Sequence, residues 1–208
     1  MKRISYFWIF CFSLTILLSC HKKNQEEKLR IACIGDSITY GAYIWNRGKY
    51  SYPARLNQSL GDNWDVENFG VNGATLLKKG DKTYWDQREF HAAIEFKPHV
   101  VLIMLGTNDT KAHNWLHKRE FVLDYKDLIS CFAELTPAPI IYICYPIPIY
   151  SSDETGLESE MLPMIDKIAS ESDVRLIDLY SVLNGKEDHY RDGVHPNKKG
   201  TALIAGKI

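Results

Sequence analysis

Short apolar runs alternate with segments of helical periodicity along most of this sequence, and this alternation constrains the fold more than any other feature. Apolar runs occupy residues 29–34, 100–105, 139–145 and 174–179, and residues 64–69 alternate between apolar and polar side chains. The run 100–105 is apolar throughout, as expected of a strand covered on both faces. Between the runs, helical periodicity predicts helices over 52–60, 86–96, 120–135 and 157–168, and a last one from about Asn197. Repeated strand-then-helix order predicts an α/β fold in which helices flank a five-stranded parallel sheet.

Length and charge limit the domain organisation and the kinds of partner. A chain of 208 residues is long enough for one well-buried domain and short for two. The formal net charge is −1, and we find no basic stripe of the kind that neutralises nucleic-acid phosphates. We therefore expect one domain over 29–208 and no nucleic acid among its partners.

The first twenty residues have the pattern of an export signal. A basic start at Lys2-Arg3 precedes an apolar run of about fifteen residues, which is short for a membrane-spanning helix of roughly 20 residues. The ending Leu17-Leu18-Ser19-Cys20 resembles a bacterial lipobox. We therefore expect a lipoprotein signal peptide over 1–19, lipidation of Cys20 and a polar tether over 20–28. The chain would be exported and held by this lipid anchor on a bacterial membrane, at its periplasmic or cell-surface face. A simple N-terminal anchor and a signal cleaved elsewhere remain alternatives.

Four polar motifs follow predicted strands. They are Gly35-Asp36-Ser37, Gly70-Val71-Asn72-Gly73, Gly106-Thr107-Asn108-Asp109 and Asp192-Gly193-Val194-His195. Because ligands of open parallel sheets bind beyond the carboxyl ends of the strands, we expect these motifs to meet at one edge.

Together these motifs contain what acyl transfer by a serine requires. A serine hydroxyl needs a neighbouring base, which His195 can supply, and Asp192 lies close enough across a turn to orient the imidazole. Gly70 offers a backbone N–H and Asn108 a side-chain amide as donors to an oxyanion. Each motif alone is equally compatible with a cap or a turn. Their order at successive strand ends favours the catalytic interpretation.

The combination of Gly35-Asp36-Ser37-Ile38, Gly70, Gly106-x-Asn108-Asp109 and Asp192-x-x-His195 resembles the sequence blocks of the SGNH (GDSL-type) serine hydrolases. The resemblance covers nearly all of 29–208, and Ile38 replaces the usual leucine. It implies a three-layer, flavodoxin-like fold and an esterase without metal or other cofactor. In that mechanism Ser37 is the nucleophile, His195 the base and Asp192 its orienting acid. The N–H groups of Ser37 and Gly70 form the oxyanion hole with Asn108.

Other reactive side chains are weaker candidates. His113 and His117 have the spacing of metal ligands on one helix face, but no acidic zincin partner accompanies them. Cys33, Cys131 and Cys144 lie in apolar segments and are expected to pack as small hydrophobes.

The segments 68–85 and 106–115 are similar to carbohydrate O-acetylesterases of this family, including sialate O-acetylesterase-like proteins. The resemblance favours an O-acylated carbohydrate as substrate. Aromatic rings in loops can stack on sugars, and the candidate substrate contacts are Asp36, Tyr43, Trp45, Trp85 and Trp115. Some of these rings are expected to cover the core instead. A lysophospholipase or thioesterase, or a non-catalytic glycan-binding lipoprotein, remains an alternative.

Overall fold

The structure, a computed structural model, describes residues 27–151 and 156–208. Across these two ranges, no helix is both long and apolar enough to cross a membrane. The expected signal peptide, Cys20 and all but the last two tether residues lie outside them.

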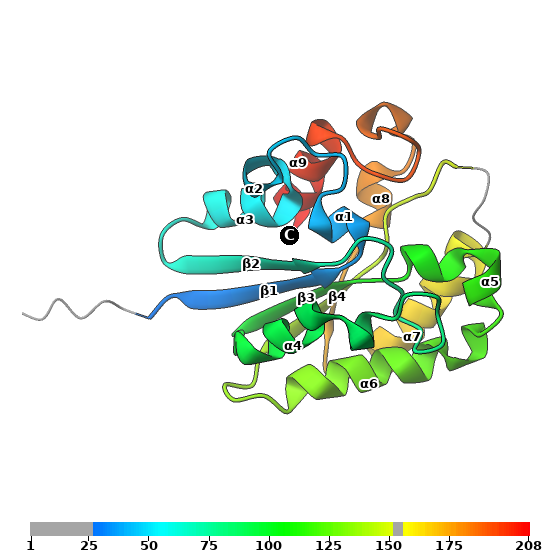
Figure 1. Cartoon of the computed structure of the whole chain (residues 1–208), viewed down its shortest axis with the longest axis horizontal. Coiled ribbons are helices and arrows are strands. Elements are labelled where there is room, and N and C mark those ends of the chain that lie inside the picture. The colour runs from blue at the N-terminus through cyan, green and yellow to red at the C-terminus, as the bar shows by residue number, and fades with distance from the viewer. Residues whose placement is uncertain (1–26, 152–155) are drawn as a thin grey trace, which may run out of the picture.

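Five parallel strands form a single sheet, as predicted (Figure 1). The strands are β1 (Leu29–Gly35), β2 (Trp64–Gly70), β3 (Val100–Met104), β4 (Ile140–Cys144) and β5 (Arg175–Ile177). Their order, β2-β1-β3-β4-β5, is the flavodoxin-like order: β2 is added on one side of β1, and β3, β4 and β5 are added on the other. The ends of β1 and β3 therefore meet where such sheets bind ligands.

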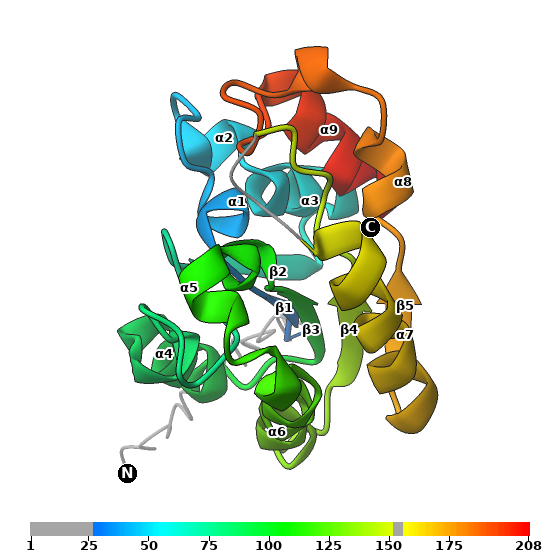
Figure 2. The ribbon, with the colours of Figure 1, turned by 90° about the vertical axis from the view of Figure 1, so that its right-hand side faces the viewer.

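Helices cover both faces of the sheet and give three layers (Figure 2). One face carries α1 (Ser37–Tyr40), α2 (Arg47–Tyr50), α3 (Tyr52–Leu60), α8 (Tyr180–Leu183) and α9 (Lys198–Lys207). The other carries α4 (Arg88–Glu95), α5 (Ala112–Trp115), α6 (Phe121–Ala133) and α7 (Leu162–Glu171). Two buried clusters, one on each side of the sheet, form the core. The three-layer prediction is therefore confirmed.

Some element boundaries differ from the predicted ones for local reasons. Strand β5 is shorter than the predicted 174–179, because Asp178 caps the next turn by accepting from Ser181 N at 2.9 Å. Helix α7 begins at Leu162 with Pro163 in its first turn, after a π-helical turn over Leu157–Met161. A proline lacks the N–H that a helix interior would need, so it is tolerated only near the start.

The three cysteines of the described chain are free. Cys33 and Cys144 are buried in the core, and Cys131 is half-buried. Burial raises the pKa of the Cys144 thiol to about 12, so this group packs as a small hydrophobe, as expected.

Candidate active site

Ser37 is the first residue of α1, and Asp36 separates it from the end of β1. Figure 1 shows the chain passing from β1 directly into α1. Gly35 makes this turn possible, because a Cβ there would lie 2.0 Å from Thr39 Oγ1 and 2.7 Å from the Met104 carbonyl oxygen. Asp36 caps α1 by accepting from Ile38 N at 2.8 Å. Asp36 is fully buried, so its predicted role as a substrate contact is wrong: its carboxylate holds the turn that presents Ser37.

The structure brings Ser37, His195 and Asp192 together. The Ser37 Oγ and His195 Nε2 atoms are 2.9 Å apart, although 158 positions separate the two residues. On the other side of the ring, His195 Nδ1 lies 2.8 Å from Asp192 Oδ2. A hydroxyl, an imidazole and a carboxylate thus form one continuous hydrogen-bonded chain.

The loop carrying Asp192 and His195 is built to hold this geometry. Gly193 has a left-handed φ of +82°, a conformation that side chains disfavour. The turn lets Asp192 Oδ1 accept from Val194 N at 3.1 Å and His195 N at 2.7 Å. Tyr150 N, from the loop after β4, donates to the Gly193 carbonyl at 2.7 Å.

The Asp192 carboxyl is held in its ionised form. Partial burial raises its pKa, but the hydrogen bonds from the N–H and the imidazole of His195 outweigh this effect. The pKa of Asp192 therefore lies below its ordinary value. An ionised carboxylate at this position can fix the imidazole's tautomer and stabilise its charged form.

Asn108 points its amide toward the same edge from the turn after β3. Its Nδ2 donates to the Ala74 carbonyl at 3.1 Å, and its own backbone carbonyl accepts from Asn114 Nδ2 at 2.9 Å. A carboxamide nitrogen carries two hydrogens. One fixes the side chain against Ala74, and the second is left to donate to an oxyanion.

The expectation that the Gly70 N–H serves as an oxyanion donor is not supported. That N–H donates to Asn68 Oδ1 at 2.9 Å. A Cβ on Gly70 would lie 2.2 Å from Tyr40 N and 2.7 Å from the Thr39 carbonyl carbon. Glycine is required here because the backbone of α1 passes directly over it.

Gly73 is a candidate donor at this edge that the sequence reasoning missed. Across residues 27–151 and 156–208 we find no acceptor for its N–H. It adjoins Ala74, whose carbonyl holds Asn108, and its φ is +77°. The available signal is the second glycine of Gly70-Val71-Asn72-Gly73.

Asp109, beside Asn108, braces this loop. Its fully buried carboxylate accepts from Leu76 N at 3.0 Å and Leu77 N at 2.8 Å. Burial raises the pKa of Asp109 to about 6, against the opposing effect of these two hydrogen bonds.

The four candidate aromatic contacts divide into two pairs. Tyr43 and Trp45 are 65% and 76% exposed, and the Tyr43 ring centroid lies 5.0 Å from that of His195. Trp115 is buried, and its Nε1 donates to Glu160 at 3.3 Å. Trp85 packs half-buried against Phe90 and donates to the Leu76 carbonyl at 3.0 Å. The predictions for Trp85 and Trp115 are therefore corrected: both rings cover the core.

His113 and His117, which have the spacing of metal ligands, do not belong to a metal-binding group in the described part of the chain. His113 Nε2 lies 3.0 Å from Asp81 Oδ2. The described part of the chain contains no group of three His, Cys, Asp or Glu side chains arranged to hold a metal ion.

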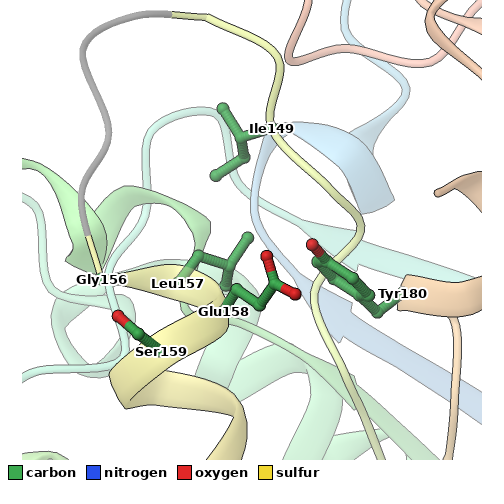
Figure 3. Close-up of a pocket in the computed structure, with 6 residues that line it drawn as sticks. All are labelled: Ile149, Gly156, Leu157, Glu158, Ser159 and Tyr180. Carbon is green, nitrogen blue, oxygen red and sulfur yellow. The ribbon is translucent and has the colours of Figure 1, made fainter. Parts of the chain in front are cut away.

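A hollow of about 310 Å³ lies near this edge, between the loop after β4 and the start of α7 (Figure 3). Ile149 and Leu157 contribute apolar atoms to it, whereas Glu158, Ser159 and Tyr180 contribute polar ones. Burial and the neighbouring Glu158 carboxylate raise the pKa of Tyr180. The lining of the hollow is therefore mixed and not continuously apolar.

Comparisons with known proteins identify the family of this chain. The model of the GDSL-like lipase/acylhydrolase family matches residues 33–203. An acetylxylan esterase of Xylanibacter ruminicola is 37% identical over 203 residues, which cover 87% of this chain and 42% of that protein. The chain thus spans less than half the length of this relative.

Solved structures show the same fold. An aryl esterase of M. smegmatis superposes with a TM-score of 0.70 at 22% identity, over 86% of this chain and 95% of that one. A carbohydrate acetylesterase of Sinorhizobium meliloti gives a TM-score of 0.69 at 18% identity with the same coverage. The family match extends over most of the sequence, and the chain belongs to the GDSL-like lipase/acylhydrolase family of carboxylic ester hydrolases.

Proposed function

We propose that this chain removes small acyl groups, acetyl above all, from an O-acylated carbohydrate, with Ser37 as nucleophile. The observation that carries the proposal is the 2.9 Å contact between Ser37 Oγ and His195 Nε2, continued by the 2.8 Å contact from His195 Nδ1 to Asp192. This arrangement places a base within reach of the hydroxyl proton and a carboxylate behind the base.

The reaction proceeds in two halves. Ser37 Oγ attacks the ester carbonyl carbon as His195 Nε2 takes its proton, and the carbonyl oxygen becomes an oxyanion. His195 then returns the proton to the departing sugar hydroxyl, which leaves an acyl group on Ser37. Water, deprotonated by His195, releases the acid and restores Ser37.

The oxyanion is stabilised by donors already in place. We assign this role to the N–H groups of Ser37 and Gly73 and to the second hydrogen of Asn108 Nδ2. Because Ala74 and Asn114 hold Asn108 in position, little reorganisation is needed when the charge develops.

The carbohydrate substrate rests on independent observations. The relative from Xylanibacter ruminicola is an acetylxylan esterase, and a structural neighbour is a carbohydrate acetylesterase. The exposed Tyr43 ring lies beside His195, and the exposed Trp45 ring lines the same cleft as Tyr43. Flat apolar faces of this kind can stack on a sugar.

An acetate-release panel tests the proposal. The enzyme should release acetate from acetylated xylan fragments, and p-nitrophenyl esters should be cleaved more slowly as the acyl chain lengthens. Ser37→Ala should abolish both activities. Ser130→Ala, which removes an exposed hydroxyl on α6, is the matched control and should retain them. A preference for long acyl chains would point to a lysophospholipase or thioesterase. Absence of hydrolysis of every ester tested would point to a non-catalytic binding protein.

We also propose that the chain is exported and anchored through a lipid on Cys20, because the pattern of residues 1–20 matches a lipoprotein signal. Metabolic labelling with a fatty-acid probe should label the wild type and not Cys20→Ala. Equal labelling of the two proteins would refute the assignment.

A further inference from the structure

A cleft of about 420 Å³ opens beside His195. It lies between the loop after α1 and the start of α9, and its lining residues are Tyr43, Ile44, Trp45, Asp188, Arg191, Asn197, Lys198 and Lys199. Two contacts join it to the candidate active site. The Tyr43 ring packs edge-on against the His195 ring, and Arg191 N donates to the His195 carbonyl at 2.8 Å. A sugar in this cleft would therefore be next to the ester held at Ser37.

The cleft carries an excess of positive charge. Arg191, Lys198 and Lys199 are all exposed, and the lining contains a single carboxylate, Asp188. The Asp188 carboxylate already has a hydrogen-bond partner in His189 Nδ1, at 2.8 Å. A hydrogen bond from His189, with a smaller contribution from the charge of Lys199, holds the pKa of Asp188 below its ordinary value.

These cations differ from four lysines on the other side of the sheet. Lys78, Lys79, Lys118 and Lys126 each have a carboxylate partner. By contrast, in the described ranges no carboxylate lies within salt-bridge distance of the three cations of the cleft. Lys198 Nζ instead lies 5.2 Å from the Trp45 ring centroid and 4.0 Å from that of Tyr50. The charge in the cleft is therefore available to an anionic ligand.

The aromatic side of the cleft is held in an unusual backbone conformation. Tyr43 and Asn46, on either side of Trp45, have left-handed φ values of +59° and +53°. Residues other than glycine rarely adopt this conformation, and those that do are concentrated at functional sites. The conformation leaves Trp45 76% exposed, so its ring presents a face to solvent beside Lys198.

We propose that this basic–aromatic cleft, formed by Tyr43, Trp45, Arg191, Lys198 and Lys199, binds an anionic sugar residue of the substrate. The aromatic rings stack on the pyranose while the cations bind its carboxylate or sulfate. The preferred substrate is then an acidic glycan in which the acetyl ester is close to a charged sugar. This inference rests on the proposed carbohydrate esterase function and specifies the substrate class.

Binding without turnover tests the inference separately from the esterase function. In the Ser37→Ala background, calorimetry would compare three oligosaccharides without acetyl groups: a neutral xylo-oligosaccharide, one bearing glucuronic acid and a sulfated one. Binding of an acidic oligosaccharide should be at least about tenfold tighter than that of the neutral one. The difference should shrink at high salt, because salt screens exposed charges. Comparison of the two acidic oligosaccharides shows whether the cleft prefers a carboxylate or a sulfate.

Variants locate the effect. Added to Ser37→Ala, the pair Lys198→Gln and Lys199→Gln should remove the preference for the acidic oligosaccharide, and Trp45→Ala should weaken all three ligands. Lys167→Gln, an exposed lysine on α7, is the matched control and should retain the preference. Thermal unfolding confirms that each variant is folded.

Three outcomes would overturn the inference: equal affinity for neutral and acidic oligosaccharides, a preference that survives the lysine substitutions, or binding of anionic lipid vesicles in place of acidic sugars. Failure of the esterase proposal is a different result, namely no acetate release from any acetylated carbohydrate by the wild type.

Discussion

Replacing Asn108 with alanine removes one oxyanion donor and one structural hydrogen bond at the same time, and the structure separates the two effects. The amide donates one hydrogen to the Ala74 carbonyl at 3.1 Å, and its second hydrogen is the proposed donor to the reacting oxygen. Loss of the hydrogen bond to Ala74 lowers the stability of the fold. Loss of the second hydrogen raises the free energy of the transition state, in which the oxyanion forms.

The expected magnitudes follow from this division. Loss of an oxyanion-hole donor typically lowers kcat by ~10²–10³, and KM should change little because the charge is absent in the ground state. Ala74 is fully buried, so its carbonyl loses its partner at a cost of about 1–3 kcal/mol. For a domain of this size, that cost lowers Tm by roughly 2–12 °C.

Asn114→Ala is the control that isolates the structural part. Asn114 Nδ2 donates to the Asn108 carbonyl at 2.9 Å and to Asp81 Oδ1 at 3.0 Å, and its Oδ1 accepts from Asp81 N at 2.9 Å. Its loss should lower Tm at least as much as Asn108→Ala, with a much smaller fall in kcat. Steady-state kinetics with p-nitrophenyl acetate and thermal unfolding measure both quantities. An Asn108→Ala enzyme that keeps kcat within about threefold, or changes only KM, would refute the donor role.

Three further predictions concern the residues around this centre. Gly70→Ala should lower both Tm and activity, because its Cβ would lie 2.2 Å from Tyr40 N and displace α1; a thermal scan matching the wild type would contradict this steric role. Asp192→Asn should lower kcat by up to ~10⁴ by favouring the wrong imidazole tautomer, and a loss below about tenfold in steady-state assays would count against the orienting role. Burial raises the pKa of Asp109 from 3.8 to about 6, so the folded protein binds more protons than the unfolded chain between these values. The stability contributed by the neutral carboxyl is therefore full below about pH 4 and falls, by on the order of 3 kcal/mol, as the pH rises through about 6. Denaturant unfolding at several pH values should show that Asp109→Asn flattens this decline, and an unchanged slope would exclude Asp109 as its source.

The sheet and the meeting of its loops follow from sequence because they depend on regular patterns. Buried strands need continuous apolar runs, and parallel strands place their carboxyl ends at one edge. That rule was sufficient to predict that Ser37 and His195 would be neighbours, and their atoms are 2.9 Å apart. The four-residue helices α1, α2, α5 and α8 escaped prediction because one turn is too short to show helical periodicity.

The features of the site that could not be predicted from the sequence are the hydrogen-bond partners of single N–H groups and the burial of single side chains. Whether Gly70 or Gly73 offers a free N–H depends on Asn68, whose side-chain oxygen accepts from the N–H of Gly70, two residues further along the chain. Likewise, Trp45 and Trp115 both follow strands, yet α5 turns Trp115 into the core while the left-handed turn around Trp45 exposes it. Tertiary packing determines which N–H is free and which ring is buried, and the local sequence does not show either.

Covalent labelling of the nucleophile tests the central claim most directly. The intact protein would be incubated with a phosphonofluoridate, which reacts with activated serines, and the adduct mapped by peptide mass spectrometry. We expect one adduct, on Ser37, absent in Ser37→Ala and formed far more slowly in His195→Gln. An adduct on another residue, or labelling of Ser37 at an unchanged rate without the imidazole, would contradict the proposed mechanism.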